Sequence, residues 1–387
     1  MLLLKHATVL TMADAGVIEN GDVLMDAGKI VSVGTNLPQD GYEVIDCTGK
    51  IVLPGFVDAH AHRSNFPENG EGSGDINELT NPVTADMNAY YAIDPSNVSF
   101  KLSCQHGITT NCIAPGSGNV VGGYCVAMKA AGKGLAQQVI ANPVALKAAM
   151  GINPKGVYSG KTRCPMTRMG IAQTLREYLQ KVQAYMKKKA EAGDDPEKMP
   201  KYDEAMEHGI PVFEKKIPLK VHSYQQDMMT VLEIADEFDI DVTLDHALGA
   251  SDFVEEIASN PHVRGVIYGP IYIGLFPGEG CKVDFDAMMK LDDAGVNTAM
   301  MTDALLSCEQ MLVNQVGECV RAGMDPIRAL RMLTVNPAKM LGLDHRIGML
   351  KEGMDADVVV FDKMPCVAPS AQVQMTIIDG EIVYKKQ

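Results

Sequence analysis

Two histidines separated by one residue are the clearest sign of chemistry in this chain. His60 and His62 come directly after residues 53–57, an apolar run with the composition of a buried β-strand. Because side chains alternate faces along a strand, both imidazoles point to the same side at its end, where they can share one cation. An isolated pair of this kind also occurs as two surface histidines, so the metal interpretation depends on its surroundings.

Three more residues of metal-binding type stand at the ends of predicted strands. His222 follows residues 218–221, His246 follows residues 242–245, and Asp303 follows residues 299–302. Taken singly, such a histidine is more often a hydrogen-bonded core or loop residue, and such an aspartate is more often a helix N-cap. Taken together with the His60 and His62 pair, they form a set of imidazoles and a carboxylate that suits zinc.

The elements between these residues alternate between strands and helices. Apolar β-type runs are predicted at residues 51–57, 107–113, 219–222, 241–245, 265–268 and 298–302, and helical stretches at 170–190, 228–238, 285–294 and 309–322. This rhythm favours a (β/α)8 TIM barrel over a doubly wound sheet, because metal-type residues recur at strand ends throughout. The third and fourth strands, between residues 120 and 150, are the least clearly defined.

Both ends of the chain are rich in short β-type runs and lack a helical period. Such runs occupy residues 2–10, 22–25, 29–33 and 43–46, then 356–361 and 374–379, followed by a hairpin arm at 380–383. We therefore predict a small composite β-sandwich domain from residues 1–52 plus 348–387. The (β/α)8 barrel is predicted to occupy residues 53–347.

The amino-acid composition and the net charge exclude several classes of protein. With 387 residues, 46% of them hydrophobic and 21% charged, the chain can bury a large core, and no run is long enough for a transmembrane span. A net charge of −15 opposes binding to nucleic acid or to an anionic membrane. Nine scattered cysteines without a CxxC pair indicate reduced thiols. We expect a cytoplasmic homo-oligomer that acts on a small molecule.

The sequence resembles the amidohydrolase superfamily over nearly its whole length. The lead-in at residues 45–50 running on to His62, and the segment 353–358, look like the imidazolonepropionase-related branch. The resemblance implies one or two bound divalent metals, most simply zinc. The implied ligands are His60, His62, His222, His246 and Asp303.

A sixth ligand is implied only by resemblance. Residues 144–149 look like the lysine segment of isoaspartyl dipeptidase-like members, in which a carboxylated lysine bridges two metals, so Lys147 is the candidate. The alternative is a solvated surface lysine. Members of the imidazolonepropionase-related branch often carry a carboxylate near the position of Ile152, which this chain lacks.

The ligand set predicts a hydrolytic reaction. A metal lowers the pKa of its bound water towards neutrality and polarises a substrate carbonyl, and Asp303 would take the water's proton and pass it to the leaving nitrogen. The expected reaction is hydrolysis of a carbon–nitrogen bond in a small amide, cyclic amide or dipeptide-like molecule. Arg163 and Arg168 could bind a substrate carboxylate, although both also fit as helix-capping or surface residues.

Two other functions stay open from the sequence. A metal-dependent deaminase of an aminated heterocycle is less favoured, because deaminases of the superfamily carry glutamate three residues after the histidine of the fifth strand, where this chain has Gln225. Gln225 cannot carry a proton. A non-catalytic barrel that serves as a binding subunit is also possible in principle, but a scaffold has no need of the complete ligand set.

Overall fold

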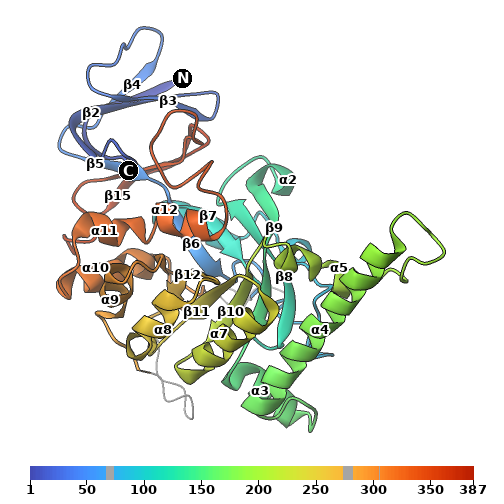
Figure 1. Cartoon of the computed structure of the whole chain (residues 1–387). Coiled ribbons are helices and arrows are strands. Elements are labelled where there is room, and N and C mark those ends of the chain that lie inside the picture. Colours follow the sequence, from blue (N-terminus) through green and yellow to red (C-terminus); the bar gives the residue numbers. More distant parts are fainter. Residues whose placement is uncertain (67–73, 273–281, 305) are drawn as a thin grey trace.

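The computed structural model describes residues 1–66, 74–272, 282–304 and 306–387, and their strands form two eight-stranded sheets. One sheet forms the body of the molecule, and the other lies at one end, where both termini are found (Figure 1). The strands of the body are β6 (Phe56–Ala61), β7 (Ile108–Ile113), β8 (Val121–Lys129), β9 (Val139–Ala149), β10 (Leu219–Ser223), β11 (Val242–His246), β12 (Val263–Tyr268) and β13 (Thr298–Met300).

The body sheet is a TIM-like barrel, as expected. Its strand order runs from β13 down to β6 without a break, so neighbours in sequence are neighbours in space. The two edges meet just beyond the end of β13, where the amide of Asp303 donates to the carbonyl of His60 at 3.1 Å and that of His62 to Ala304 at 2.8 Å. These bonds draw β6 and the end of β13 together and nearly close the barrel.

One strand departs from the predicted (β/α)8 pattern. β8 is antiparallel to both β7 and β9, whereas the other neighbouring pairs of this sheet are parallel. The physical reason is the length of the connections. Only residues 114–120 join β7 to β8 and residues 130–138 join β8 to β9, while a parallel crossover needs a dozen residues or more. This is the region where the sequence defined strands least clearly.

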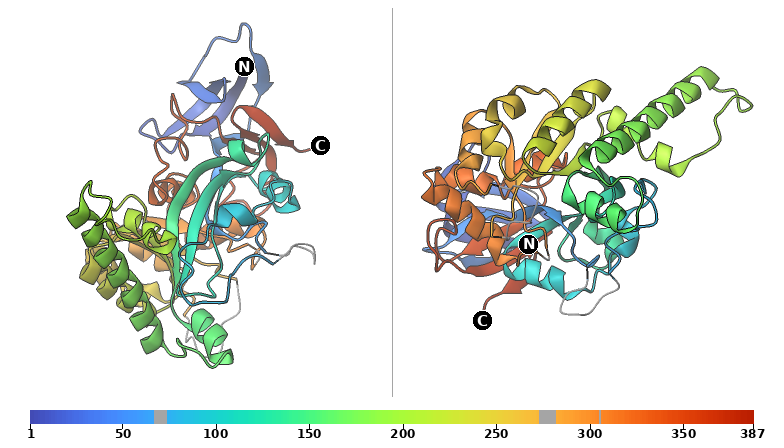
Figure 2. Two further views of the ribbon diagram at one scale, coloured as in Figure 1. Left: turned by 90° about the vertical axis from the view of Figure 1, so that its right-hand side faces the viewer. Right: turned by 90° about the horizontal axis from the view of Figure 1, so that it is seen from below.

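Helices connect and follow the strands of the barrel, and those after the later strands cover its outside (Figure 2). They are α1 (Val98–Gln105), α2 (Leu135–Gln138), α3 (Ile152–Gly160), α4 (Arg168–Ala192), α5 (Glu204–Glu207), α6 (Ile210–Phe213), α7 (Gln226–Phe238), α8 (Val254–Ser259), α9 (Ala287–Asp293), α10 (Gln310–Arg321), α11 (Pro326–Arg331) and α12 (Val335–Met340). The four predicted helices correspond to α4, α7, α9 and α10. The C-terminal part of α4 projects from the body. No helix in the described ranges has the length and apolarity needed to cross a bilayer.

The second sheet combines both ends of the chain, as predicted. Its strands are β1 (Leu2–Leu10), β2 (Val17–Asp26), β3 (Lys29–Gly34), β4 (Glu43–Asp46), β5 (Ile51–Pro54), β14 (Val358–Phe361), β15 (Val373–Ile378) and β16 (Glu381–Lys385). Pairing of β14 with β5 joins the two ends, and all eight strands hydrogen-bond as one sheet with its own apolar core. The division into 1–52 plus 348–387 and 53–347 stays a proposal.

The chain passes from one sheet to the other at a glycine. Gly55 stands between β5 and β6, and a Cβ atom there would lie 2.2 Å from the side chain of Thr109. Glycine therefore lets the first barrel strand pass close against β7. The apolar run 51–57, one strand in the sequence prediction, is divided here between the two sheets.

A buried lysine links the barrel to the second sheet. Lys129, the last residue of β8, is 1% exposed and places its ammonium 2.9 Å from Asp355, 3.1 Å from Asp357 and in contact with Asp379. Burial raises the pKa of Asp357 to about 6, with Lys129 opposing that rise. The ammonium is thus the counter-charge for carboxylates that surround it.

Replacement of this lysine is expected to destabilise the fold. Lys129→Met removes the charge but leaves the buried carboxylates, so we expect the free energy of unfolding to fall by about 3–5 kcal/mol in denaturant titration. Lys133→Met is the matched control, because Lys133 is 79% exposed and lies 3.9 Å from Glu381. Equal stability of the two variants would show that the buried cluster does not hold the sheets together.

Candidate metal centre

Imidazoles from three barrel strands and one carboxylate meet at the carboxyl end of the barrel. His60 lies on β6 and His62 directly after it, His222 lies on β10, and His246 is the last residue of β11. Asp303 follows β13 by three residues. The five side chains that the sequence singled out therefore come together at one end of the barrel, where its parallel strands end.

Hydrogen bonds orient three of the imidazoles. In each of them Nδ1 faces an oxygen and so carries the proton, which leaves Nε2 as a lone-pair donor. The acceptors are Asp245 Oδ2 for His60 at 2.5 Å, the Ala114 carbonyl for His62 at 2.8 Å, and the Gly269 carbonyl for His246 at 2.9 Å. The orientation is that of histidines prepared to bind a metal through Nε2.

The distances between the ligand atoms fit a metal ion. Nε2 of His60 and Nε2 of His62 lie 3.3 Å apart, and Oδ1 of Asp303 lies 3.5 and 3.2 Å from them. One ligand atom each of His60, His246 and Asp303 lie within 4.8 Å of one another. Tetrahedral zinc with Zn–N distances of about 2.0–2.1 Å spaces its ligands about 3.3 Å apart. Lone pairs held this close without a shared proton repel, so the residues present fit a cation.

The electrostatics keep the imidazoles neutral and the carboxylate ionised. Burial, assisted by Lys147 and Lys220, holds the pKa of His60 well below its usual range. Burial does the same to the pKa values of His222 and His246. Burial raises the pKa of the Asp303 carboxyl, but the neighbouring His246 and His62 lower it by more. The pKa of Asp303 therefore lies below its usual value. Neutral imidazoles and an anionic carboxylate are the forms that bind a divalent metal.

Two of these residues have unusual backbone. His246 has φ of 66° and Asp303 has φ of 50°, both in the left-handed region that non-glycine residues rarely adopt. Such conformations persist where the surroundings impose them, and they cluster at functional sites. They turn the chain as it leaves β11 and β13.

Several buried polar atoms have no hydrogen-bond partner among the described residues, and two of them concern the predicted ligands. These two are Nδ1 of His222 and Nζ of Lys147, a residue of β9 that is 1% exposed. His222 Nε2 lies 3.3 Å from Nδ2 of Asn153. Burial lowers the pKa of Lys147. Lys147 is thus enclosed in the barrel rather than solvated, and the two orphan atoms are the kind that a bound group satisfies.

A buried ion pair behind His60 escaped the sequence analysis. Lys220 Nζ lies 2.7 Å from Asp245 Oδ2, the same oxygen that accepts from His60. Both residues are essentially unexposed. Strand alternation offered a signal, because Lys220 precedes His222 by two residues and so shares its face of β10. Nothing local could show that β11 brings Asp245 to His60.

A second buried network holds the segment before Asp303. The Arg63 guanidinium is unexposed and contacts Asp58 at 3.1 Å, Glu309 at 2.5 Å and Asn111 at 2.6 Å. Asp58 in turn accepts from the amide and the hydroxyl of Thr302, at 3.1 and 2.5 Å. Because Thr302 adjoins Asp303, this network positions the carboxylate. Arg63 adjoins His62 in sequence, but its burial could not be read from the sequence.

The cluster opens into a cavity of about 350 Å3. Four of its lining residues are His62, His222, His246 and Asp303. The other described lining residues are Phe66, Ile76, Asn77, Gly116, Ser117, Gly118, Asn153, Val157, Tyr224 and Leu306. A volume of this size admits a small molecule next to the ligand atoms.

The two arginines assigned by the sequence to substrate binding are not among these lining residues. Arg163 is exposed and donates to the carbonyl of Thr80 at 2.6 Å. Arg168 begins α4 and donates to Asp227 at 2.8 Å. Gln225 is also absent from the described lining; a Cβ at Gly249 would meet its side chain at 2.5 Å.

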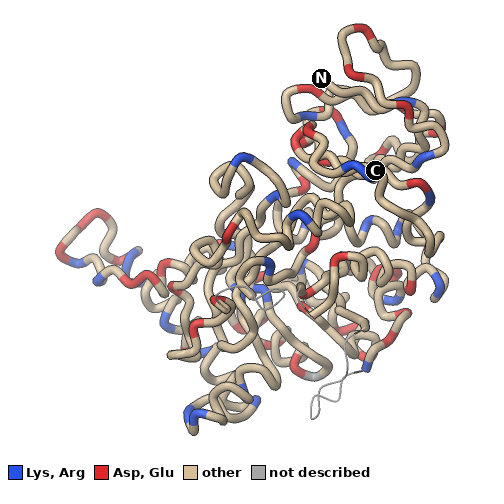
Figure 3. The backbone as a smooth tube through the Cα atoms, turned by 180° about the vertical axis from the view of Figure 1, so that it is seen from behind, with Lys and Arg blue, Asp and Glu red and all other residues tan. Residues whose placement is uncertain are grey.

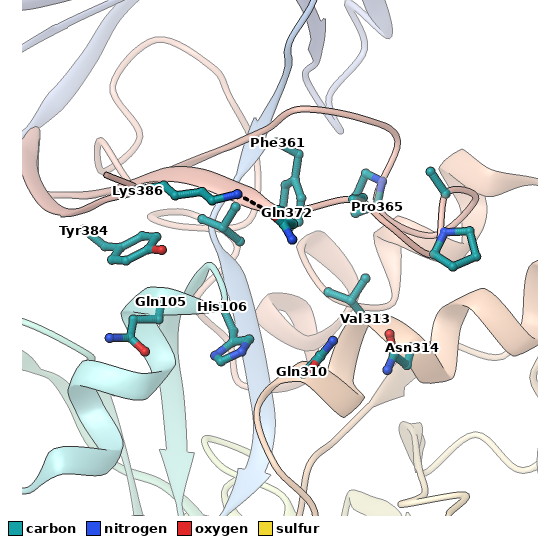
Figure 4. A pocket seen from close by; sticks show the side chains of 14 residues that line it. Gln105, His106, Gln310, Val313, Asn314, Phe361, Pro365, Gln372, Tyr384 and Lys386 are labelled. Carbon is teal, nitrogen blue, oxygen red and sulfur yellow. Dashed lines mark hydrogen bonds between the residues drawn. The ribbon is translucent and has the colours of Figure 1, made fainter.

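A second cavity of about 340 Å3 lies where α1 and α10 face the second sheet (Figure 4). Its described lining contains one histidine, His106, and no carboxylate or cysteine. His106 Nδ1 faces the carbonyl of Leu102 at 3.0 Å, and Lys386 contacts Gln372. This cavity has no ligand set, so the cluster at the barrel end is the better candidate site.

Fold and site together define a class: a TIM-like barrel with histidine and carboxylate side chains gathered at its strand ends. The chain is 34% identical to an amidohydrolase from Thermotoga maritima MSB8 whose crystal structure superimposes with a TM-score of 0.93, with 100% of both chains covered. A model described as "Amidohydrolase family" matches residues 277–383. The chain belongs to the amidohydrolase superfamily, and its class is that of hydrolases acting on carbon–nitrogen bonds.

Sequence relatives agree with this assignment. Imidazolonepropionase from Thermoplasma acidophilum is 25% identical, with 97% of this chain and 92% of that protein covered. The protein named amidohydrolase tasK from Hapsidospora irregularis is 26% identical over 93% of this chain, which spans 39% of that relative's length. An adenosine deaminase structure from Xanthomonas campestris with bound zinc shares the fold, with a TM-score of 0.56, 16% identity, and 98% and 92% of the two chains covered.

Proposed function

We propose that this chain is a metal-dependent amidohydrolase that hydrolyses a carbon–nitrogen bond of a small amide, cyclic amide or dipeptide-like molecule. The observation that carries the proposal is the convergence of Nε2 atoms from His60 and His62 on the carboxylate of Asp303, beside a cavity. His222 and His246 complete the proposed ligand set. The family supports the same reaction class, and the zinc-bound structural neighbour supports the choice of metal.

The chain's own residues have distinct roles in this proposal. A divalent ion held by the cluster, most simply zinc, would activate a water molecule and polarise the scissile carbonyl. Asp303 would accept the water's proton and deliver it to the leaving nitrogen, for which its lowered pKa keeps it ionised at neutral pH. Lys220 and Asp245 would fix His60 as the tautomer that presents Nε2.

We further propose that Lys147 bridges two metals as a carboxylated lysine. Its buried Nζ without a hydrogen-bond partner supports this role, because a neutral amine can take up carbon dioxide and the resulting anion would offset two cations. The partnerless Nδ1 of His222 is a second buried atom that a bound group would satisfy. One metal without a bridge remains the simpler alternative.

The metal content per chain tests both proposals. Elemental analysis of zinc-loaded protein is expected to find about two ions in the wild type and one or none in Lys147→Ala. Lys147→Glu, which supplies a carboxylate directly, is expected to restore the second ion. Lys155→Ala on α3 is the matched control and should match the wild type. One ion in every variant would remove Lys147 from the site, and none in the wild type would refute the metal-dependent function.

The position of Gln225 supports amide hydrolysis over deamination. Its side chain is packed against Gly249 and is absent from the described cavity lining, so it offers the site neither a carboxylate nor a carboxamide. Release of ammonia from an aminated heterocycle by the zinc-loaded protein, with no turnover of amides, would reverse this preference. A metal-loaded protein that turns over neither would favour the binding-subunit alternative.

A further inference from the structure

The described walls of the metal-site cavity carry no fixed positive charge. Among its described lining residues there is no lysine or arginine. Residues 67–73, 273–281 and 305, which lie outside the described ranges, contain no lysine, arginine or histidine in sequence either. Apart from the ligand set, the described walls are apolar side chains, glycines, one tyrosine, one serine and two asparagines.

The three cations between the end of α3 and the start of α4 already have hydrogen-bond or ion-pair partners. Lys161 Nζ contacts the carbonyl of Leu79, and Arg163 donates to the carbonyl of Thr80. Both therefore tie the start of the α3–α4 connection to the segment that carries Ile76 and Asn77 of the cavity wall. Arg168 is paired with the buried carboxylate of Asp227. These residues position the wall and do not offer their charge to its interior.

The polar groups on the walls suit neutral hydrogen-bonding partners. Oδ1 of Asn77 accepts from the amide of Gly118 at 3.0 Å, and its side chain packs so closely on Gly116 that a Cβ there would lie 2.4 Å from Nδ2. Asn153 places Nδ2 3.3 Å from His222 Nε2, at the edge of the ligand cluster. Carboxamides can donate to a carbonyl or accept from an N–H, but they do not neutralise a carboxylate.

We infer that the substrate is an uncharged amide with an apolar portion next to the scissile bond, and not an amide that carries a carboxylate. This inference rests on the proposed function and adds the substrate's charge. A carboxylate moved from water to these walls would lose hydration without gaining a counter-ion. The net charge of −15, with acidic positions spread over the whole fold, also repels anions (Figure 3). Phe66, Ile76, Val157 and Leu306 provide the apolar contacts.

Binding of two matched metal-directed probes tests the inference without knowledge of the substrate. Benzohydroxamic acid and 4-carboxybenzohydroxamic acid present the same metal-binding group and differ by one carboxylate. Calorimetric titration of the zinc-loaded protein is expected to show at least about tenfold tighter binding of the uncharged probe. Equal or tighter binding of the carboxylated probe would overturn the inference.

A second experiment places a positive charge on the cavity wall and repeats the binding measurements. Val157→Arg puts a cation on the α3 wall and is expected to reduce or reverse the preference, whereas Ser159→Arg puts the same charge on α3 outside the described lining and should leave it unchanged. An unchanged preference in a folded Val157→Arg variant would count against the wall as its origin. If neither probe binds although the protein holds zinc, the proposed function fails and the inference fails with it. That outcome differs from equal binding of both probes, which would refute the charge preference alone.

Discussion

Asp303→Asn is expected to lower kcat for amide hydrolysis by about 10^2–10^4-fold while much of the bound metal is retained. The asparagine keeps the size of the side chain and one oxygen, but it cannot take a proton. Nε2 atoms of His60 and His62 lie 3.3 Å apart and still converge in the variant, so a ligand set remains. The measurement is kcat on an amide that the zinc-loaded wild type hydrolyses, together with metal content on the same samples.

Asp227→Asn is the control for this prediction. Asp227 is also a buried aspartate, 3% exposed, but it pairs with Arg168 and does not line the described cavity. No comparable fall in kcat is expected for it. If excess zinc restored full activity to Asp303→Asn, the carboxylate would act as a ligand alone and its proton-transfer role would be wrong.

His60→Ala is expected to abolish both zinc binding and hydrolysis. The substitution removes one Nε2 ligand and strands the Lys220–Asp245 pair, which then has no imidazole to orient. Zinc that binds only the folded state raises its stability by RT ln(1 + [Zn]/Kd), about 2.7 kcal/mol at a concentration of one hundred times Kd. Thermal unfolding with and without zinc should therefore show a stabilising shift in the wild type and none in the variant.

His106→Ala tests whether this effect belongs to the barrel-end cluster. His106 is the histidine of the second cavity, beside α10 and the second sheet (Figure 4). Its removal should preserve both the metal content and the zinc-dependent shift in Tm. Wild-type zinc content in His60→Ala would place the metal elsewhere and refute the ligand assignment.

The general plan of the molecule was predictable from local sequence patterns. Strand alternation placed His60 and His62 on one face, and the short β-type runs at both ends indicated the composite second sheet that β5 and β14 join. The predicted parallel course of β8 was wrong, because its connections are too short for crossovers. The placement of the arginines could not be foreseen, since Asp227 lies 59 residues from Arg168 in sequence.

The sequence by itself determined which residues stand at strand ends, because apolar runs and the period of two are local properties. Only the tertiary structure decided which of them touch. The pair of His60 and Asp245 spans 185 residues and exists because β6 and β11 belong to one barrel. The burial of Lys147 and the absence of cations from the described cavity walls have the same origin: both depend on strand order and register, which no local pattern specifies.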